Sequence, residues 1–305
     1  MAKKLRTVLS LFDGMSCGQI ALKELGIEFD AYYASEIDKN AIANTQLNFP
    51  NTIQLGDVEK WREWDIDWSK VDLILAGSPC QGFSVAGQLK AFNDPRSKLF
   101  WTFSSILHHV ENINENVWFI LENVVLRYDW KGTISFDLGV EPLQINSSTL
   151  TAQERKRLYW TNIASVFNKN TRLFKTMIPI PQDKGLILRD VLDEDASNYY
   201  YYEAFNNLPY QEKKNVRYYE TKFAQSGAVP TLLSKSKCLT CAHGCTGSTL
   251  FDGVGVRRIT IKEKRRLQSI PDWYRFVDGI SYSAASNLLG NGWTVDVIKH
   301  ILSYL

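Results

Sequence analysis

The sequence lacks the long apolar stretches that mark membrane-spanning and exported proteins. No run approaches the roughly 18 apolar residues that a bilayer-spanning helix needs. The basic start, Met1–Arg6, leads directly into a short β-like stretch and lacks the apolar core and small-residue cleavage site of a signal peptide. We therefore expect a cytoplasmic protein that has no membrane partner.

Cysteine is scarce as well. The chain has five cysteines among 305 residues, an odd number that argues against a disulfide framework and in favour of reduced thiols. Three of them lie in Cys238-x-x-Cys241-x-His243-x-Cys245. Four ligands packed so tightly fit poorly around one tetrahedral zinc ion unless a second half-motif completes the site. We therefore predict no metal.

Acidic residues are under-represented in one long segment. The net charge is only +2, but residues 151–266 hold 20 Lys and Arg against 11 Asp and Glu, whereas the rest holds 15 against 22. A basic segment on an acidic body indicates a polyanion bound on one face, and scattered solvated charge is the alternative. With 45% hydrophobic residues, the chain has enough apolar side chains to form a sizeable core.

The order of apolar runs predicts an α/β fold. Five strand-like runs alternate with helical patterns in the first 145 residues, and the last two are nearly continuous, as in strands buried on both faces. These runs are Thr7–Phe12, Ala31–Glu36, Thr52–Asp57, Val71–Ala76 and Val117–Leu121. The alternation predicts a doubly wound, mostly parallel sheet.

After residue 162 the alternation stops. The segment up to residue 256 contains short mixed strands and turn-rich stretches, which predict a smaller, irregular and mainly β domain. Regular structure returns at Thr260-x-x-Glu263, a capping-box pattern that opens a basic helix, which we expect to stop at Pro271. We therefore divide the chain into a first domain (1–161), a second domain (162–256) and a return segment that completes the first (257–305).

A glycine-containing turn follows the first strand. Gly14 and Gly18 let the backbone turn sharply, so that a ligand can approach closely. Glu36 and Asp57 end the next two strands at the same edge of the sheet, where a carboxylate can accept hydrogen bonds from ribose hydroxyls. Because the full Gly-x-Gly-x-x-Gly fingerprint is missing and no basic residue suits a pyrophosphate, we favour S-adenosylmethionine over a dinucleotide. A glycine turn without a ligand is the alternative.

The fourth strand ends in Pro79-Cys80-Gln81. A cysteine at the mouth of a parallel sheet lies where open α/β sheets bind ligands, and its thiolate is a strong nucleophile if a positive charge or helix N-terminus lowers its pKa. Glu122-Asn123-Val124 ends the neighbouring strand, so we expect the Glu122 carboxylate to lie beside Cys80. An inert buried cysteine is the alternative for Cys80.

Polar residues alternate in Gln153-x-Arg155-x-Arg157, and in an extended segment all three side chains would emerge on one face. Each of them alone is compatible with a surface salt bridge. Together with Cys80 and Glu122 they fit C5 chemistry on cytosine. That carbon is unreactive until a nucleophile adds at C6, and the negative charge pushed into the ring needs donors at N3 and O2.

These motifs, in this order, resemble those of the C5-cytosine DNA methyltransferase family over nearly the whole chain. The likeness is to the bacterial and phage enzymes, with some likeness to the vertebrate de novo branch. Two departures are Ser16-Cys17-Gly18 in place of the usual Gly-Gly, and Trp293 where smaller residues are common. The matching motifs are Phe12-x-Gly14 with Gly18, Glu36, Asp57, Pro79-Cys80-Gln81, Glu122-Asn123-Val124, Gln153-x-Arg155-x-Arg157, Arg257-Arg258-x-Thr260-x-x-Glu263-x-x-Arg266-Leu267-Gln268 and Gly290-Asn291.

The resemblance implies a Rossmann-like, S-adenosylmethionine-dependent methyltransferase that flips a cytosine out of duplex DNA and methylates its C5. It implies that Cys80 attacks C6, that Glu122 holds N3, and that Arg157, helped by Arg155, contacts O2. Gln81 would help to fill the gap left by the flipped base. The residues assigned to the cofactor pocket are Phe12, Asp13, Gly14, Gly18, Glu36, Ile37, Asp57, Asn291 and Val58, the last of them against the adenine.

The same resemblance assigns residues 162–256 to target recognition. It implies a monomer, bacterial or phage-encoded, that acts on double-stranded DNA, with a cognate restriction endonuclease as a candidate partner. Three alternatives stay open. A tRNA cytosine-5 methyltransferase would share the catalytic set, a catalytically inactive DNA-binding regulator of the same fold should have lost Cys80, and a nicotinamide dehydrogenase needs the glycine fingerprint that is missing.

Overall fold

The computed structural model describes residues 4–78, 98–193, 199–206, 208–219, 228–240 and 248–305. The chain folds into two compact units, each built from separate stretches of the sequence. The first unit comprises residues 1–145, 156–180 and 298–305, and the second comprises residues 146–155 and 181–297. Within the described part, no helix is long and apolar enough to cross a membrane.

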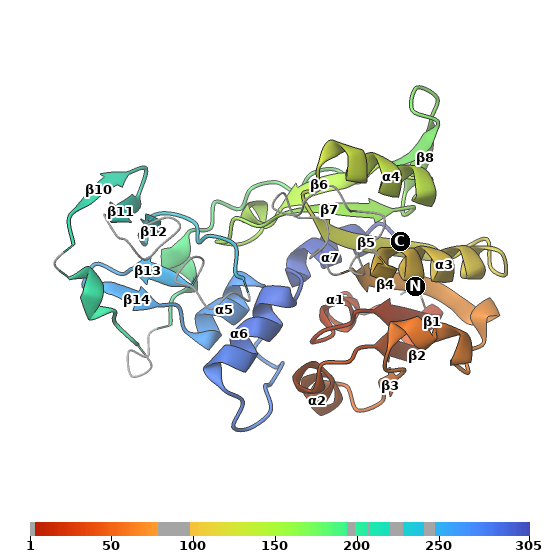
Figure 1. Cartoon of the computed structure of the whole chain (residues 1–305), viewed down its shortest axis with the longest axis horizontal. Coiled ribbons are helices and arrows are strands. Elements are labelled where there is room, and N and C mark those ends of the chain that lie inside the picture. The colour runs from red at the N-terminus through yellow and green to blue at the C-terminus, as the bar shows by residue number, and fades with distance from the viewer. Residues whose placement is uncertain (1–3, 79–97, 194–198, 207, 220–227, 241–247) are drawn as a thin grey trace. The chain divides into compact units, whose positions relative to one another are not determined.

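A seven-stranded sheet forms the centre of the first unit, with the strand order β3-β2-β1-β4-β5-β7-β6 (Figure 1). Pairs among β1 to β5 are parallel, whereas β7 pairs antiparallel with β5. The predicted doubly wound, mostly parallel sheet is confirmed. The strands are β1 (Lys4–Leu11), β2 (Glu28–Ser35), β3 (Ile53–Gln54), β4 (Val71–Gly77), β5 (Trp118–Val124), β6 (Leu143–Asn146) and β7 (Lys156–Thr161).

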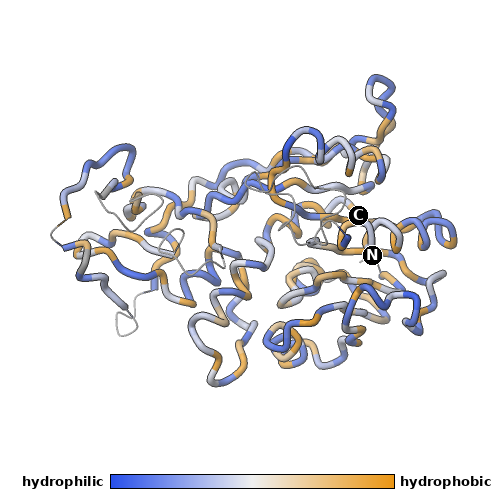
Figure 2. Tube along the Cα trace, in the orientation of Figure 1, coloured by the Kyte–Doolittle hydropathy of each residue, from blue (hydrophilic) through white to orange (hydrophobic). Residues whose placement is uncertain are grey.

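The middle strands are apolar on both faces because both faces are buried. In β4, Ile74 and Ala76 belong to the core that includes α3, while Leu73 and Leu75 are equally buried. Figure 2 shows the hydrophobic colour gathered on these strands. The helices of this unit are α1 (Cys17–Glu24), α2 (Lys39–Asn48), α3 (Lys98–Glu111) and α4 (Tyr128–Leu138), and α7 (Val295–Leu302) ends within it.

Helix α3 shows how the sequence builds this core. The pattern places apolar residues along one helical face, and Phe103, Ile106 and Val110 are fully buried in it. Helix α4 spans 11 residues and buries Trp130, Ile134, Ser135 and Leu138. It ends at Gly139, whose φ of +68° suits glycine because other residues pay a steric penalty there.

The second unit contains short antiparallel sheets and two helices. One sheet joins β10 (Tyr210–Lys213), β11 (Val216–Tyr219) and β12 (Ala228–Pro230), and another joins β13 (Thr249–Phe251) with β14 (Val256–Arg258). The helices are α5 (Ile261–Leu267) and α6 (Tyr282–Asn291). A hairpin of β8 (Ser165–Asn168) and β9 (Leu173–Thr176), by contrast, belongs to the first unit.

The predicted capping box opens α5. The Thr260 hydroxyl accepts a hydrogen bond from the backbone N–H of Glu263 at 3.1 Å, and the Glu263 carboxylate accepts one from the Thr260 N–H at 2.8 Å. The helix ends at Leu267, earlier than the expected stop at Pro271. Its last turn closes on Gln268, whose backbone N–H donates to Lys264 and Arg265 carbonyls, so the chain leaves the helix before proline would stop it.

Candidate active site

The turn between β1 and α1 is held in an unusual backbone conformation. Phe12, Gly14 and Ser16 have φ values of +57°, +56° and +61°, in the left-handed region that suits glycine and strains other residues. Ser16 lies in the Ser16-Cys17-Gly18 run that departs from the expected Gly-Gly, and glycine would adopt its φ without strain. The turn therefore brings three residues with positive φ together at the carboxyl end of β1.

Glu36 fixes this turn from the end of β2. One oxygen of its carboxylate accepts the backbone N–H of Gly14 at 2.8 Å, and the other accepts those of Ile37 and Asp38 at 2.7 and 2.9 Å. Oε2 keeps one acceptor site beyond these bonds, because an ionised carboxylate has about four lone-pair sites, two on each oxygen. Glu36 thus joins two strand ends and still offers one acceptor site to a ligand.

Asp13 lies at the centre of a buried polar cluster next to the turn. Its Oδ1 accepts from the Tyr32 hydroxyl at 3.0 Å and lies 3.2 Å from the Ser16 hydroxyl. Its Oδ2 is buried and has no hydrogen-bond partner among the described residues. Burial raises the pKa of Asp13 to about 6, and the nearby Glu36 charge acts in the same direction. An uncompensated acceptor at this place fits a cationic or hydroxyl-bearing ligand.

Of the remaining predicted cofactor residues of the first unit, Gly18 is buried in α1 and the others follow β2 and β3. Asp57 is exposed and accepts the backbone N–H of Glu59 at 2.9 Å, which caps a short 3-10 helix (Val58–Glu63). Ile37 is 72% exposed, whereas Val58 belongs to the buried core. The three ionisable residues at these strand ends, Asp13, Glu36 and Asp57, are all acids. Three carboxyl groups fit S-adenosylmethionine, which carries an ammonium, a sulfonium and ribose hydroxyls. They do not suit a pyrophosphate, because like charges repel.

The next strand ends lie side by side in β4 and β5. Gly77 is the parallel partner of Glu122, and the Asn123 side chain donates to the Ser78 hydroxyl at 3.1 Å. Ser78 is buried and is the last described residue before Pro79. Cys80 and Gln81 lie outside the described residues. The structure therefore fixes the strand end from which the Cys80 segment continues, and Asn123 anchors that end, a role that sequence reasoning did not assign.

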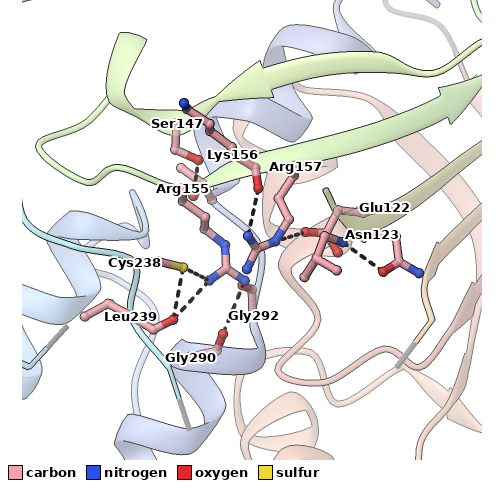
Figure 3. Close-up of polar contacts among 12 residues, drawn as sticks. Glu122, Asn123, Ser147, Arg155, Lys156, Arg157, Cys238, Leu239, Gly290 and Gly292 are labelled. Carbon is pink, nitrogen blue, oxygen red and sulfur yellow. Dashed lines mark hydrogen bonds and ion pairs between the residues drawn. The ribbon is translucent and has the colours of Figure 1, made fainter. Parts of the chain in front are cut away.

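Glu122 and Arg157 form an ion pair across β5 and β7 (Figure 3). Antiparallel pairing places Val124 opposite Arg157 and Glu122 opposite Tyr159, so Glu122 and Arg157 are diagonal neighbours on one face. Arg157 Nε lies 2.9 Å from Glu122 Oε1, and the two side chains are only 14% and 10% exposed. The contact lacks hydrogen-bond geometry, since Glu122 Oε1 has no hydrogen-bond partner among the described residues. A carboxylate and a guanidinium are thus held together at the edge of the sheet.

Arg155 has a different environment from Arg157. It is 4% exposed, and within the second unit its guanidinium donates to Cys238 Sγ and to three backbone carbonyls, those of Leu239, Gly290 and Gly292 (Figure 3). Asn291, between these two glycines, is exposed at the end of α6. The Cys241, His243 and Cys245 part of the cysteine cluster lies outside the described residues, and the described ones contain no metal-binding group.

Comparison with known proteins identifies the family of the chain. The family of C-5 cytosine-specific DNA methylases matches residues 6–127 and 143–305, and the chain belongs to this family. Membership implies S-adenosylmethionine as methyl donor. The chain is 27% identical over 325 residues to the type II methyltransferase M.HpaII of Haemophilus parainfluenzae, covering 96% of this chain and 87% of that one. Over 147 residues it is 40% identical to the orphan methyltransferase M.Rho11sI of Bacillus phage rho11s, covering 45% of this chain and 25% of that one.

Solved structures of the same fold include two eukaryotic proteins. A DNMT2 variant of Spodoptera frugiperda is 23% identical, with a TM-score of 0.66 over 98% of this chain and 99% of that one. The methyltransferase EhMeth of Entamoeba histolytica is 17% identical, with a TM-score of 0.71 over 99% and 98%. At these identities the likeness shows the fold alone.

Proposed function

We propose that this protein is a DNA (cytosine-5)-methyltransferase that acts on double-stranded DNA. The observation that carries the proposal is the Glu122–Arg157 pair, which lies beside the end of β4, where the chain continues into Pro79-Cys80-Gln81. A nucleophile, a protonated carboxyl group that donates to N3 and a guanidinium that donates to O2 are the groups that C5 chemistry on cytosine requires. Similarity to a type II methyltransferase over most of both chains supports DNA as the acceptor.

In the proposed reaction the Cys80 thiolate adds to C6 of a cytosine flipped out of the duplex. Glu122 holds N3 and Arg157 contacts O2, so that the negative charge pushed into the ring is stabilised while C5 becomes nucleophilic. S-adenosylmethionine, when bound, would supply the methyl group to C5 and would leave as S-adenosylhomocysteine. Loss of the C5 proton then expels the Cys80 sulfur from C6 and restores the ring, and Gln81 helps to fill the gap left in the duplex.

The proposed cofactor pocket is formed mainly at the carboxyl ends of β1, β2 and β3. Glu36 and Asp57 would accept bonds from the ribose, and Asp13 lies beside the turn that the ligand approaches. The turn geometry of Gly14, fixed by Glu36, supports this assignment. Further residues of the proposed pocket are Phe12, Gly18, Ile37, Val58 and Asn291.

We further propose a division of the chain by function. Residues 1–161 and 257–305 would form the catalytic domain, and residues 162–256 would recognise the target sequence. The second unit, with its short antiparallel sheets, supplies most of the proposed recognition segment. The protein would act as a monomer in the cytoplasm, and a cognate restriction endonuclease is its candidate partner.

The test compares methyl acceptors and a nucleophile variant. Wild-type protein should transfer labelled methyl groups to duplex DNA in preference to tRNA, and bisulfite sequencing should locate them at C5 of cytosine. Cys80→Ser should abolish transfer while DNA binding persists, because a hydroxyl at neutral pH lacks thiolate character. Duplex DNA with 5-fluorocytosine at the target should form a covalent adduct with the wild type only. Preference for tRNA, or near-normal transfer by Cys80→Ser, would contradict the proposal.

A further inference from the structure

A buried polar network in the second unit joins three stretches of chain that are distant in sequence (Figure 3). Arg155 is its first member. One terminal nitrogen, Nη1, donates to Cys238 Sγ at 3.3 Å and to the Leu239 carbonyl at 3.2 Å. The other, Nη2, donates to the carbonyls of Gly290 and Gly292 at 3.2 and 3.0 Å. One guanidinium therefore holds the chain at residues 238–239 and at residues 290–292.

Gln153 and Gln268 extend the network. Gln153 accepts the backbone N–H of Leu239 at 2.9 Å and donates to Gln268 Oε1 at 3.2 Å. Gln268 in turn donates to the Leu289 and Gly292 carbonyls and accepts the Thr294 hydroxyl at 2.8 Å. Both glutamines are fully buried. Because buried polar groups depend on their partners, such a network specifies one arrangement of the backbone.

The network meets the backbone on both sides of Asn291. The last carbonyls of a helix have no partner within the helix, and here Arg155 and Gln268 supply donors to those at the end of α6. Gly290 and Gly292 are buried, whereas Asn291 is exposed. The side chain of Asn291 is therefore presented outward by backbone that is fixed from the buried side.

Contact with a base would require Arg155 to leave this environment. Its withdrawal would leave three buried carbonyls without their charged donor, and unmade bonds to buried groups are costly. Arg157, in contrast, is engaged with Glu122 at the sheet edge and with the Lys156 carbonyl next to it. The two arginines of one motif thus have different partners.

We propose that Arg155 and Gln153 are positioning residues. They hold the C-terminal end of α6, at Asn291, in the conformation that binds the cofactor, and they tie it to the recognition segment at Cys238–Leu239. Of the two arginines, Arg157 then serves the target base. The proposal rests on the function proposed above for the Asn291 and Glu122 sites. It replaces the expectation that Arg155 helps Arg157 at O2.

The experiment compares Arg155→Met with Arg157→Met as a matched control. S-adenosylmethionine affinity is measured by calorimetry without nucleic acid, and KM and kcat are measured with duplex DNA. We expect Arg155→Met to weaken cofactor binding at least tenfold while kcat at saturating cofactor falls less than threefold. Arg157→Met should leave cofactor affinity within twofold and lower kcat at least a hundredfold. Arg155→Lys should restore part of the affinity, since an ammonium reaches some of the same carbonyls.

A milder variant guards against misfolding of Arg155→Met. Thr294→Val removes the hydroxyl that donates to Gln268 and accepts from the Ser147 hydroxyl at 2.9 Å. It should weaken cofactor binding severalfold, with faster amide exchange at residues 289–295. Unchanged cofactor affinity in both Arg155→Met and Thr294→Val would overturn the proposal, as would equal cofactor loss in Arg157→Met. Because calorimetry needs no methyl acceptor, these results decide the role of Arg155 even if wild-type protein methylates RNA rather than DNA.

Discussion

Asp13, in the turn between β1 and α1, makes the free energy of unfolding depend on pH. In the unfolded chain an aspartate titrates near its ordinary pKa of 3.8, whereas burial raises the pKa of Asp13 to about 6 in the fold. The folded state therefore holds a proton that the unfolded state has released, and the free energy of unfolding falls as pH rises from about 4 to about 6. Above that range the full penalty, roughly 3 kcal/mol at 1.36 kcal/mol for each pKa unit, applies.

Replacement of Asp13 by Asn should remove this dependence. The amide cannot ionise, and its oxygen can still accept from the Tyr32 hydroxyl. We expect the stability of Asp13→Asn relative to wild type to increase between pH 4.5 and pH 7, as measured by urea unfolding at both pH values. The comparison cancels the titration of other groups, including Glu36. An unchanged difference at the two pH values would show that Asp13 is solvated enough to titrate normally.

Glu36 and Asp57 make a second pair for comparison at the residue scale. Glu36 accepts three backbone N–H groups, one of them from the turn at Gly14, whereas the Asp57 side chain caps only Glu59. Each alanine variant should weaken S-adenosylmethionine binding by about 1–3 kcal/mol, the range for losing a hydrogen-bond partner that the bound ligand would bury. Glu36→Ala should also lower stability more than Asp57→Ala, because the turn loses its anchor. Calorimetry that shows normal cofactor affinity in both variants would remove these residues from the pocket.

At the scale of elements, Arg257 connects β14 to α5. Its side chain is fully buried and pairs with Asp252 at 3.0 Å and with both Glu263 oxygens at 2.8 and 3.0 Å. It therefore cannot contact a phosphate in this conformation. Arg257→Met should destabilise the protein by about 3–5 kcal/mol, because it leaves two buried carboxylates without their partner.

The control for Arg257 is its neighbour in sequence. Arg258 is half-buried and stacks over the Tyr282 ring at 3.7 Å, so Arg258→Met should cost about 1 kcal/mol. Urea unfolding of both variants gives the comparison. Equal stabilities, with weaker DNA binding in Arg257→Met alone, would show that Arg257 acts on DNA and not as a structural ion pair.

The elements differ in how far sequence could predict them. Val71–Ala76 was predictable as a strand because it is buried on both faces, which demands a continuous apolar run. The antiparallel insertion of β7 between β5 and β6 was not, since strand order depends on the path of the whole chain. The motif Gln153-x-Arg155-x-Arg157 predicted three functional side chains, yet the different partners of Arg155 and Arg157 appear only when distant carbonyls are placed. Asn123 was part of the Glu122-Asn123-Val124 motif, but no sequence pattern indicated that its side chain bonds to Ser78.

At the scale of the whole molecule, only part of the positive charge in residues 151–266 is available to bind a polyanion. Residues 151–266 carry 20 Lys and Arg, but Arg155, Arg257 and Lys264 are buried and bonded within the protein. These three cations belong to the structure and are not part of a surface for a polyanion. The exposed Lys and Arg residues of this segment would form the phosphate-binding face for the proposed DNA substrate.

The two units define where target specificity can be exchanged. A graft of residues 162–256, the segment proposed from sequence, would divide the first unit, because the β8–β9 hairpin is bonded to the rest of that unit. Asn168 donates to Glu141, and the Phe174 backbone bonds to the backbone of Gly139 and Glu141. A graft of residues 181–256 from a relative with another target leaves this hairpin intact. It must keep Asp252, since Arg257 lies just beyond the cut and depends on it.

We therefore expect the 181–256 chimera to fold and methylate, and the 162–256 chimera to be less stable. In the active chimera the methylated sequence should become that of the donor relative, because the proposed base contacts would lie in the exchanged loops while Glu122 and Arg157 stay in place. The measurement is bisulfite sequencing of DNA from expressing cells, with Cys80→Ser in the chimera as the background control. An active chimera that keeps the original target would place specificity in the catalytic part, and then the second unit would serve binding without sequence selection.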